Sequence, residues 1–162
     1  MKESIEVKNI SEAKMKLLEL EKENKYLFHG SPNLINELEP RQPTRGENEK
    51  HGKISICATP YADIAIFRSI VNPQNSTCEK HFSGFGLNQK KENVKFKFET
   101  TIEVLNSLKN KSGYVYVLNK DLFRKKNKME WRTENKITPL EVLKVSFNDL
   151  PTIEIIKDKK SI

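Results

Sequence analysis

Cysteine is scarce in this sequence, and long apolar runs are absent. Only Cys57 and Cys78 occur among 162 residues, and their spacing does not suggest a disulfide framework, so we expect reduced thiols. No apolar stretch approaches the length needed to cross a bilayer. The first six residues lack the apolar segment of a signal peptide. We therefore expect a cytoplasmic location and no membrane partner.

Metal ligands are also few. Cys78, His81 and His51 together offer three ligands to zinc. Structural zinc sites usually have four ligands in paired, closely spaced sets, and this pattern is missing. We therefore expect no metal.

Hydrophobic residues make up only 36% of the chain and charged residues 31%, but aromatic residues are spread along it, which favours a folded domain with charged faces over disorder. The length suits one domain. We expect a single domain over 1–162, with an N-terminal helical extension at 1–25, a core at 26–157 and a charged tail at 158–162. The oligomeric state stays open.

Positive charge is in excess, with 29 Lys and Arg against 22 Asp and Glu, a net charge of +7. This excess favours a polyanionic partner or an anionic ligand such as a dinucleotide. The alternative is a set of solvated, lysine-rich faces. The densest basic stretch is 124–128, which contains Lys125, Lys126 and Lys128.

Hydrophobic periodicity predicts an α+β fold with a split, mainly antiparallel sheet and a few flanking helices. Ser11 is the expected N-cap of the first helix. Thr59 is the expected N-cap of the second helix, with Pro60 in its first turn. The expected helices are 11–24, 59–72 and 101–110, the expected strands are 26–28, 54–58, 94–99, 114–118, 140–147 and 152–156, and 39–53 and 72–92 are expected loops.

A lone histidine followed by glycine is the most informative motif. Residues 26–28 predict a buried strand, and the Gly-Ser-Pro at 30–32 is expected to end it. His29 is then held at a strand end and faces a loop, where Gly30 lets a ligand approach the backbone closely. The alternative is a half-buried histidine that only makes a structural hydrogen bond.

This motif and two others, in this order, resemble the NAD-binding ADP-ribosyltransferase fold, in its diphtheria-toxin-like and poly-ADP-ribose-polymerase-like branch. The resemblance covers about 26–150. The motifs are a strand with His29-Gly30-Ser31, a strand with Ala58-Thr59 leading into a helix with Ala65 and Phe67, and the late pair Glu130-Trp131.

The resemblance implies that NAD is the substrate. His29 would bind the adenosine ribose, the Gly30 backbone the nicotinamide amide, and Phe67 one face of the nicotinamide. Glu130 would hydrogen-bond the nicotinamide ribose and promote departure of the leaving group, with His29 the second member of the catalytic pair. The other expected cofactor-binding residues are Ser31, Thr59, Tyr61 and Trp131.

The chain departs from the family at one position. The family has a tyrosine just before the small-residue pair, and this chain has Ile56 or Cys57 there. One face of the nicotinamide sandwich would then be aliphatic unless Tyr61 compensates. Losing an aromatic pair costs about 0.5–1.5 kcal/mol beyond the buried area, so NAD binding would be weakened rather than abolished.

The chemistry fits Glu130 without the family, because a preorganised carboxylate stabilises the positive charge that develops on a sugar as an N-glycosidic bond breaks. The alternative is a surface glutamate paired with Arg132 or Lys128. For Trp131 the alternative is a core residue. Arg41 and Arg45 offer a bidentate grip on a pyrophosphate, or lie in a solvated loop.

The leading hypothesis is an NAD-dependent mono-ADP-ribosyltransferase, a glycosyltransferase that transfers ADP-ribose to a protein or nucleic-acid target. One alternative is a non-catalytic NAD-binding module of the same fold. Another is a basic nucleic-acid-binding module that uses the lysines of 124–128 and stacking tyrosines. Removal of a 2′-phosphate from RNA is a related reaction, but it normally needs more arginines around the phosphate than we can place.

Overall fold

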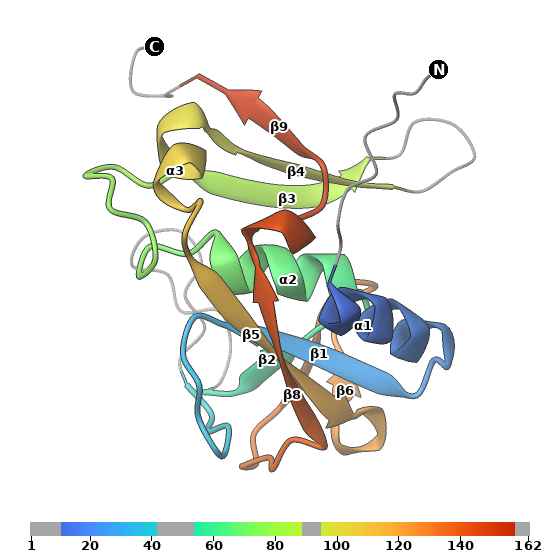
Figure 1. Ribbon diagram of the computed structural model, residues 1–162. Coiled ribbons are helices and arrows are strands. Elements are labelled where there is room, and N and C mark those ends of the chain that lie inside the picture. The colour runs from blue at the N-terminus through green and yellow to red at the C-terminus, as the bar shows by residue number, and fades with distance from the viewer. Residues whose placement is uncertain (1–10, 42–53, 89–94, 158–162) are drawn as a thin grey trace.

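The computed structural model describes residues 11–41, 54–88 and 95–157 (Figure 1). These ranges form an α+β fold of three small sheets and three helices. The helices are α1 (Glu12–Lys22), α2 (Ala62–Ile70) and α3 (Ile102–Ser107). None of the helices in these ranges is long and apolar enough to span a membrane.

The three sheets have three strands each. All pairs are antiparallel except β4 and β9. The first sheet has the order β1 (Tyr26–Ser31), β5 (Ser112–Asn119) and β8 (Glu141–Ser146). The second sheet has the order β2 (Ile56–Ala58), β7 (Trp131–Thr133) and β6 (Arg124–Lys125). The third sheet has the order β3 (Ser83–Asn88), β4 (Lys95–Thr101) and β9 (Ile153–Ile156).

Helix α2 lies between the first and third sheets (Figure 1). Its residues are apolar on nearly every side, as expected for a helix enclosed by its neighbours. They pack against Phe98 of β4, Val115 and Val117 of β5, and Val145 of β8 in the larger core. A smaller core lies on the other face of β1 and β5, where Leu27 and Leu118 contact Ile56 and Ala58 of β2.

Two glycines let α2 approach the first sheet closely. A Cβ on Gly30 would overlap the carbonyl oxygen of Ala65, and a Cβ on Gly113 would overlap the side chain of Ser69. Glycine at position 30 is therefore required by helix packing, a reason that the sequence analysis did not give. This contact fixes the end of β1 against α2.

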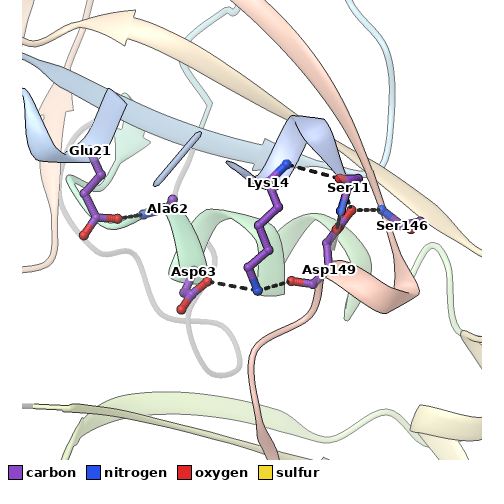
Figure 2. A network of polar contacts seen from close by, with 7 residues as sticks. All are labelled: Ser11, Lys14, Glu21, Ala62, Asp63, Ser146 and Asp149. Atoms are coloured by element: carbon purple, nitrogen blue, oxygen red, sulfur yellow. Dashed lines mark hydrogen bonds and ion pairs between the residues drawn. The ribbon is translucent and has the colours of Figure 1, made fainter. Parts of the chain in front are cut away.

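A polar network ties α1 to α2 and to the turn after β8 (Figure 2). The buried carboxylate of Asp149 accepts hydrogen bonds from the backbone N–H and hydroxyl of Ser11 and from the Ser146 N–H, at 2.9–3.0 Å. The Lys14 ammonium donates to the Asp149 carbonyl at 2.7 Å and lies 3.6 Å from the Asp63 carboxylate. Helix α1 also buries Leu17 completely in the larger core.

The expected α+β class and the first helix with its Ser11 cap are confirmed. The expected cap of the second helix is wrong: α2 begins at Ala62, and the Thr59 hydroxyl accepts from the Tyr61 N–H instead. The Glu21 carboxylate of α1 accepts the Ala62 N–H at 2.8 Å (Figure 2). A side chain distant in sequence therefore satisfies an N–H that local capping was expected to satisfy.

Two other expectations are corrected. The first strand does not end at Gly30, because Gly30 and Ser31 continue the ladder opposite Val115 and Tyr114. Part of the expected loop 72–92 is strand β3, in which Gly84 and other poor strand formers pair with β4. Most of the expected loop 39–53, including Arg45 and His51, lies outside the described residues.

Candidate functional site

A cavity of 770 Å³ opens beside α2, within the range typical of small-molecule sites. Its walls come from the end of β1, from β2, from α2, from β3 and from the turn before β7. Five residues singled out from the sequence line it: His29, Gly30, Thr59, Phe67 and Glu130. These residues lie up to about a hundred positions apart in the chain, and the fold brings them to one place.

The His29 ring is oriented by one backbone contact. Its Nδ1 lies 2.7 Å from the carbonyl oxygen of Cys57 on the neighbouring β2. A carbonyl only accepts, so Nδ1 carries the proton and Nε2 of the neutral ring carries the lone pair. Burial lowers the pKa of His29 below 6.5, and the positive charges of Arg68 and Arg41 lower it further, while the bond to Cys57 opposes them. The ring is therefore neutral at pH 7.

Glu130 is only 6% exposed, so it is not the surface residue of the alternative interpretation. It does, however, pair with Arg132, one of the two partners that the alternative interpretation named. Arg132 donates from Nε to Glu130 Oε2 at 2.7 Å, and both side chains are about nine-tenths buried. A charged pair withdrawn from water is screened little and held in one geometry.

The strand pleat explains this pair. Residues two apart in an extended chain project to the same side, so Glu130, directly before β7, lies beside Arg132 of β7. Trp131, between them, belongs to the opposite face and packs against the smaller core. The Lys120 ammonium lies 4.9 Å from the centre of its ring. Trp131 does not line the cavity and is a core residue.

Cys57 occupies the wall next to Glu130. It lines the cavity, whereas Ile56 faces the smaller core, so of the two residues considered for the expected tyrosine position only Cys57 lies at the cavity. Burial raises the pKa of the Cys57 thiol, and the negative charge of Glu130 and a hydrogen bond to it act in the same direction. The thiol is therefore protonated at pH 7 and is a poor nucleophile.

Aromatic rings form the apolar wall. Phe67 is 2% exposed, with its ring centre 5.0 Å from that of Phe98 and 6.3 Å from that of Phe85. The Arg68 guanidinium lies 5.8 Å from the Phe85 ring centre. The cavity therefore pairs an aromatic cluster with a cation at one side, which suits a planar, anionic ligand.

A second histidine lies in the same cavity. His81 Nε2 is 3.1 Å from the Ser83 hydroxyl, and both residues line the wall formed by the start of β3. Burial lowers the pKa of His81, so this ring is also neutral at pH 7. The two histidines give the cavity neutral hydrogen-bonding groups on two different walls.

Three further predicted residues are not brought to the cavity. Ser31 accepts a hydrogen bond from the Asn33 N–H in the loop after β1. Tyr61 packs edge-on against Phe96 at 4.6 Å and does not add an aromatic ring to the cavity wall. Arg41 pairs through its backbone with Ser55 and likewise lies outside the lining.

The three residues considered as zinc ligands, Cys78, His81 and His51, are not brought together among the described residues. His51 lies outside the described residues, and His81 contacts Ser83 rather than Cys78. Within the ranges that the structure describes, no three His, Cys, Asp or Glu side chains gather as metal ligands do.

Several residues in or beside the cavity were not predicted as site residues. Arg132 holds Glu130 without lining the cavity, and it was predicted only as a partner of a surface glutamate. Cys57 and Ile56 were both candidates for one position. They face opposite sides of β2, and the sequence does not show which side faces the core. His81, Ser83 and Phe85 had no usable signal, because their glycine-containing segment was expected to be a loop.

Chemically, the cavity combines a fixed imidazole, an apolar aromatic wall and a buried carboxylate held by an arginine. A carboxylate fixed in one geometry stabilises a cation that forms beside it, and the arginine offsets part of that effect. We compared the chain with protein-family models, with curated proteins and with solved structures, and none of them matches it.

Proposed function

We propose that this cavity binds NAD and that the protein is an NAD-dependent ADP-ribosyltransferase, built on a fold of that type. One observation carries the proposal: His29, Gly30, Phe67 and Glu130, chosen from the sequence, line the same cavity. The three motifs are separate in the chain and each is weakly specific alone, so their meeting at one cavity supports the proposal.

The proposed roles follow from the chemistry of each group. His29 Nε2 accepts a hydrogen bond from a ribose hydroxyl, because Nδ1 is engaged with Cys57. The nicotinamide ring lies against the aromatic wall that includes Phe67. Glu130 faces the ribose that loses nicotinamide.

Transfer proceeds by exchange at one carbon. The acceptor attacks the anomeric carbon of the nicotinamide ribose, the bond from this carbon to the pyridinium nitrogen breaks, and its electron pair leaves with neutral nicotinamide. The acceptor loses its proton to solvent or to a neighbouring base. Glu130 stabilises the positive charge that the sugar carries in between.

A second candidate function is a non-catalytic NAD-binding module. The ion pair between Glu130 and Arg132 favours it, because a carboxylate neutralised by a guanidinium stabilises a second cation less well. The tyrosine missing at Cys57 points the same way. Both candidates require NAD in the cavity.

Calorimetry with NAD tests this shared requirement. We expect saturable binding at millimolar NAD or below, weakened about tenfold or more in His29→Ala, because about 1–3 kcal/mol is lost when a buried partner loses its hydrogen bond. Ser31→Ala, two residues along β1 and outside the cavity, is the matched control and should bind as wild type does. Unchanged affinity in His29→Ala would show that the site is misplaced.

A further inference from the structure

The segment just before Glu130 is strongly basic. We call residues 124–128, between the start of β6 and the approach to β7, the basic turn. Four of its five residues are cationic, and all five are exposed. The Lys126 and Asn127 N–H groups donate to the Glu130 carbonyl oxygen at 2.9 and 3.0 Å. The basic turn is thus bonded directly to the backbone of Glu130.

The cations of the basic turn lie outside the lining of the cavity. Asn127 lines the cavity with Met129 and Glu130, whereas Lys125, Lys126 and Lys128 do not. The three lysines are exposed, so they lie beside the ligand site rather than in it. A ligand that fills the cavity leaves these lysines available to a different molecule.

The three lysines have no ion-pair partner among the residues that the structure describes. Arg124, by contrast, lies 3.5 Å from the Glu134 carboxylate. Three neighbouring ammonium groups repel one another, and a partner with closely spaced negative charges removes that repulsion. The net charge of +7 supports the same sign of partner over the whole molecule.

We infer that the basic turn docks a single nucleic-acid strand beside Glu130, which makes nucleic acid the acceptor class. The statement about the acceptor rests on the proposed function, and the docking does not. Every nucleic-acid strand offers one phosphate per nucleotide and gains affinity from counterion release, whereas an acidic protein must present a particular carboxylate cluster. A single strand is favoured because base atoms inside a duplex cannot enter a cavity.

Fluorescence anisotropy with labelled 20-nucleotide single strands of DNA and RNA tests the docking. The test variant replaces Lys125, Lys126 and Lys128 by Gln. The control variant replaces three exposed lysines elsewhere, Lys22, Lys109 and Lys144, by Gln. Each variant lowers the net charge from +7 by three, to +4, so the two differ only in where charge is lost.

We expect the turn variant to bind the strands at least tenfold more weakly at 0.1 M salt, with a salt slope shallower by about 2, since each phosphate contact on a single strand contributes about 0.7. The control variant should lose far less affinity. Equal losses in both variants would overturn the docking surface. Equal competition by polyglutamate of the same charge would overturn it in favour of an acidic protein.

Two further measurements separate this inference from the proposed function. NAD affinity should be the same in the turn variant and wild type, and a weaker affinity would assign the lysines to the NAD pyrophosphate and overturn the docking. Transfer of labelled ADP-ribose to the bound strand should require the basic turn. If the strand binds but receives no ADP-ribose, the docking surface is supported and nucleic acid is contradicted as the acceptor. NAD cleavage measured without a strand would then test the proposed function separately.

Discussion

At His29 one hydrogen bond and burial together determine the chemistry of the ring. The Cys57 carbonyl fixes the tautomer, and burial keeps the imidazole neutral. The sequence indicated a histidine held by a strand but placed it at the strand end, whereas β1 continues to Ser31 and His29 pairs with Tyr116 within the ladder; its hydrogen-bond partner was not predicted. That partner is a backbone atom of another strand, and sequence patterns carry no record of such a contact.

The depressed pKa of His29 predicts a pH-dependent stability. Below pH 6.5 the unfolded chain takes up a proton that the folded ring resists, so acid favours unfolding. The free energy of unfolding should therefore fall from pH 7.5 to 5.5 more steeply in wild type than in His29→Gln. Urea denaturation at both pH values measures the difference. His81 is present in both proteins, so its contribution to the pH dependence cancels in the comparison. An equal fall in the free energy of unfolding in both proteins would show that the folded His29 ring titrates as an ordinary histidine.

At the scale of elements, α1 is part of the larger core rather than an appendage to it. It buries Leu17, supplies the Lys14 and Ser11 contacts to the turn after β8, and caps α2 through Glu21 (Figure 2). Since α2 carries Phe67 and Arg68, α1 supports one wall of the cavity from behind. The sequence placed this helix outside the resemblance and predicted only its own N-cap.

Asp149→Ala should therefore destabilise the protein by about 3–5 kcal/mol, because it removes a fully buried carboxylate that accepts three part-buried hydrogen bonds and leaves their donors unsatisfied. Urea denaturation measures this loss. The control is Glu141→Gln, which breaks the exposed contact of α1 with β8 through Lys16 and should cost under about 1 kcal/mol. Similar small losses in both variants would mean that the network does not anchor α1.

Local signals explain which elements were predictable. The apolar period of 11–24, the alternation after 94 and the run 114–118 each predicted an element that the structure contains. Strand β3 was not predictable, since Gly84 and Gly86 favour a loop and only pairing with β4 makes them a strand. Strands β6 and β7 are too short to show a period.

On the scale of the whole molecule, the cavity is assembled by long-range packing. His29 and Phe67 reach it because glycine lets β1 lie against α2, and Glu130 reaches it because β7 pairs with β2. Sequence motifs therefore identified five of its lining residues and named Arg132 as a partner of Glu130, but they did not place Cys57 or the basic turn beside Glu130, or His81 in the cavity. Residue types and order are visible in a sequence, whereas proximity depends on the sheets.

The central claim is that Glu130 stabilises charge in an NAD-cleaving transition state, and the rate of nicotinamide release from labelled NAD tests it most directly. Glu130→Gln keeps the shape and removes the charge, so release in the presence of cell extract should fall about 10²–10³-fold with NAD affinity little altered. Glu134→Gln, directly after β7 and outside the cavity, is the matched control and should release nicotinamide as wild type does. Thermal melting of each variant checks that it is folded. Equal rates in wild type and Glu130→Gln would contradict the account, and so would no release from either.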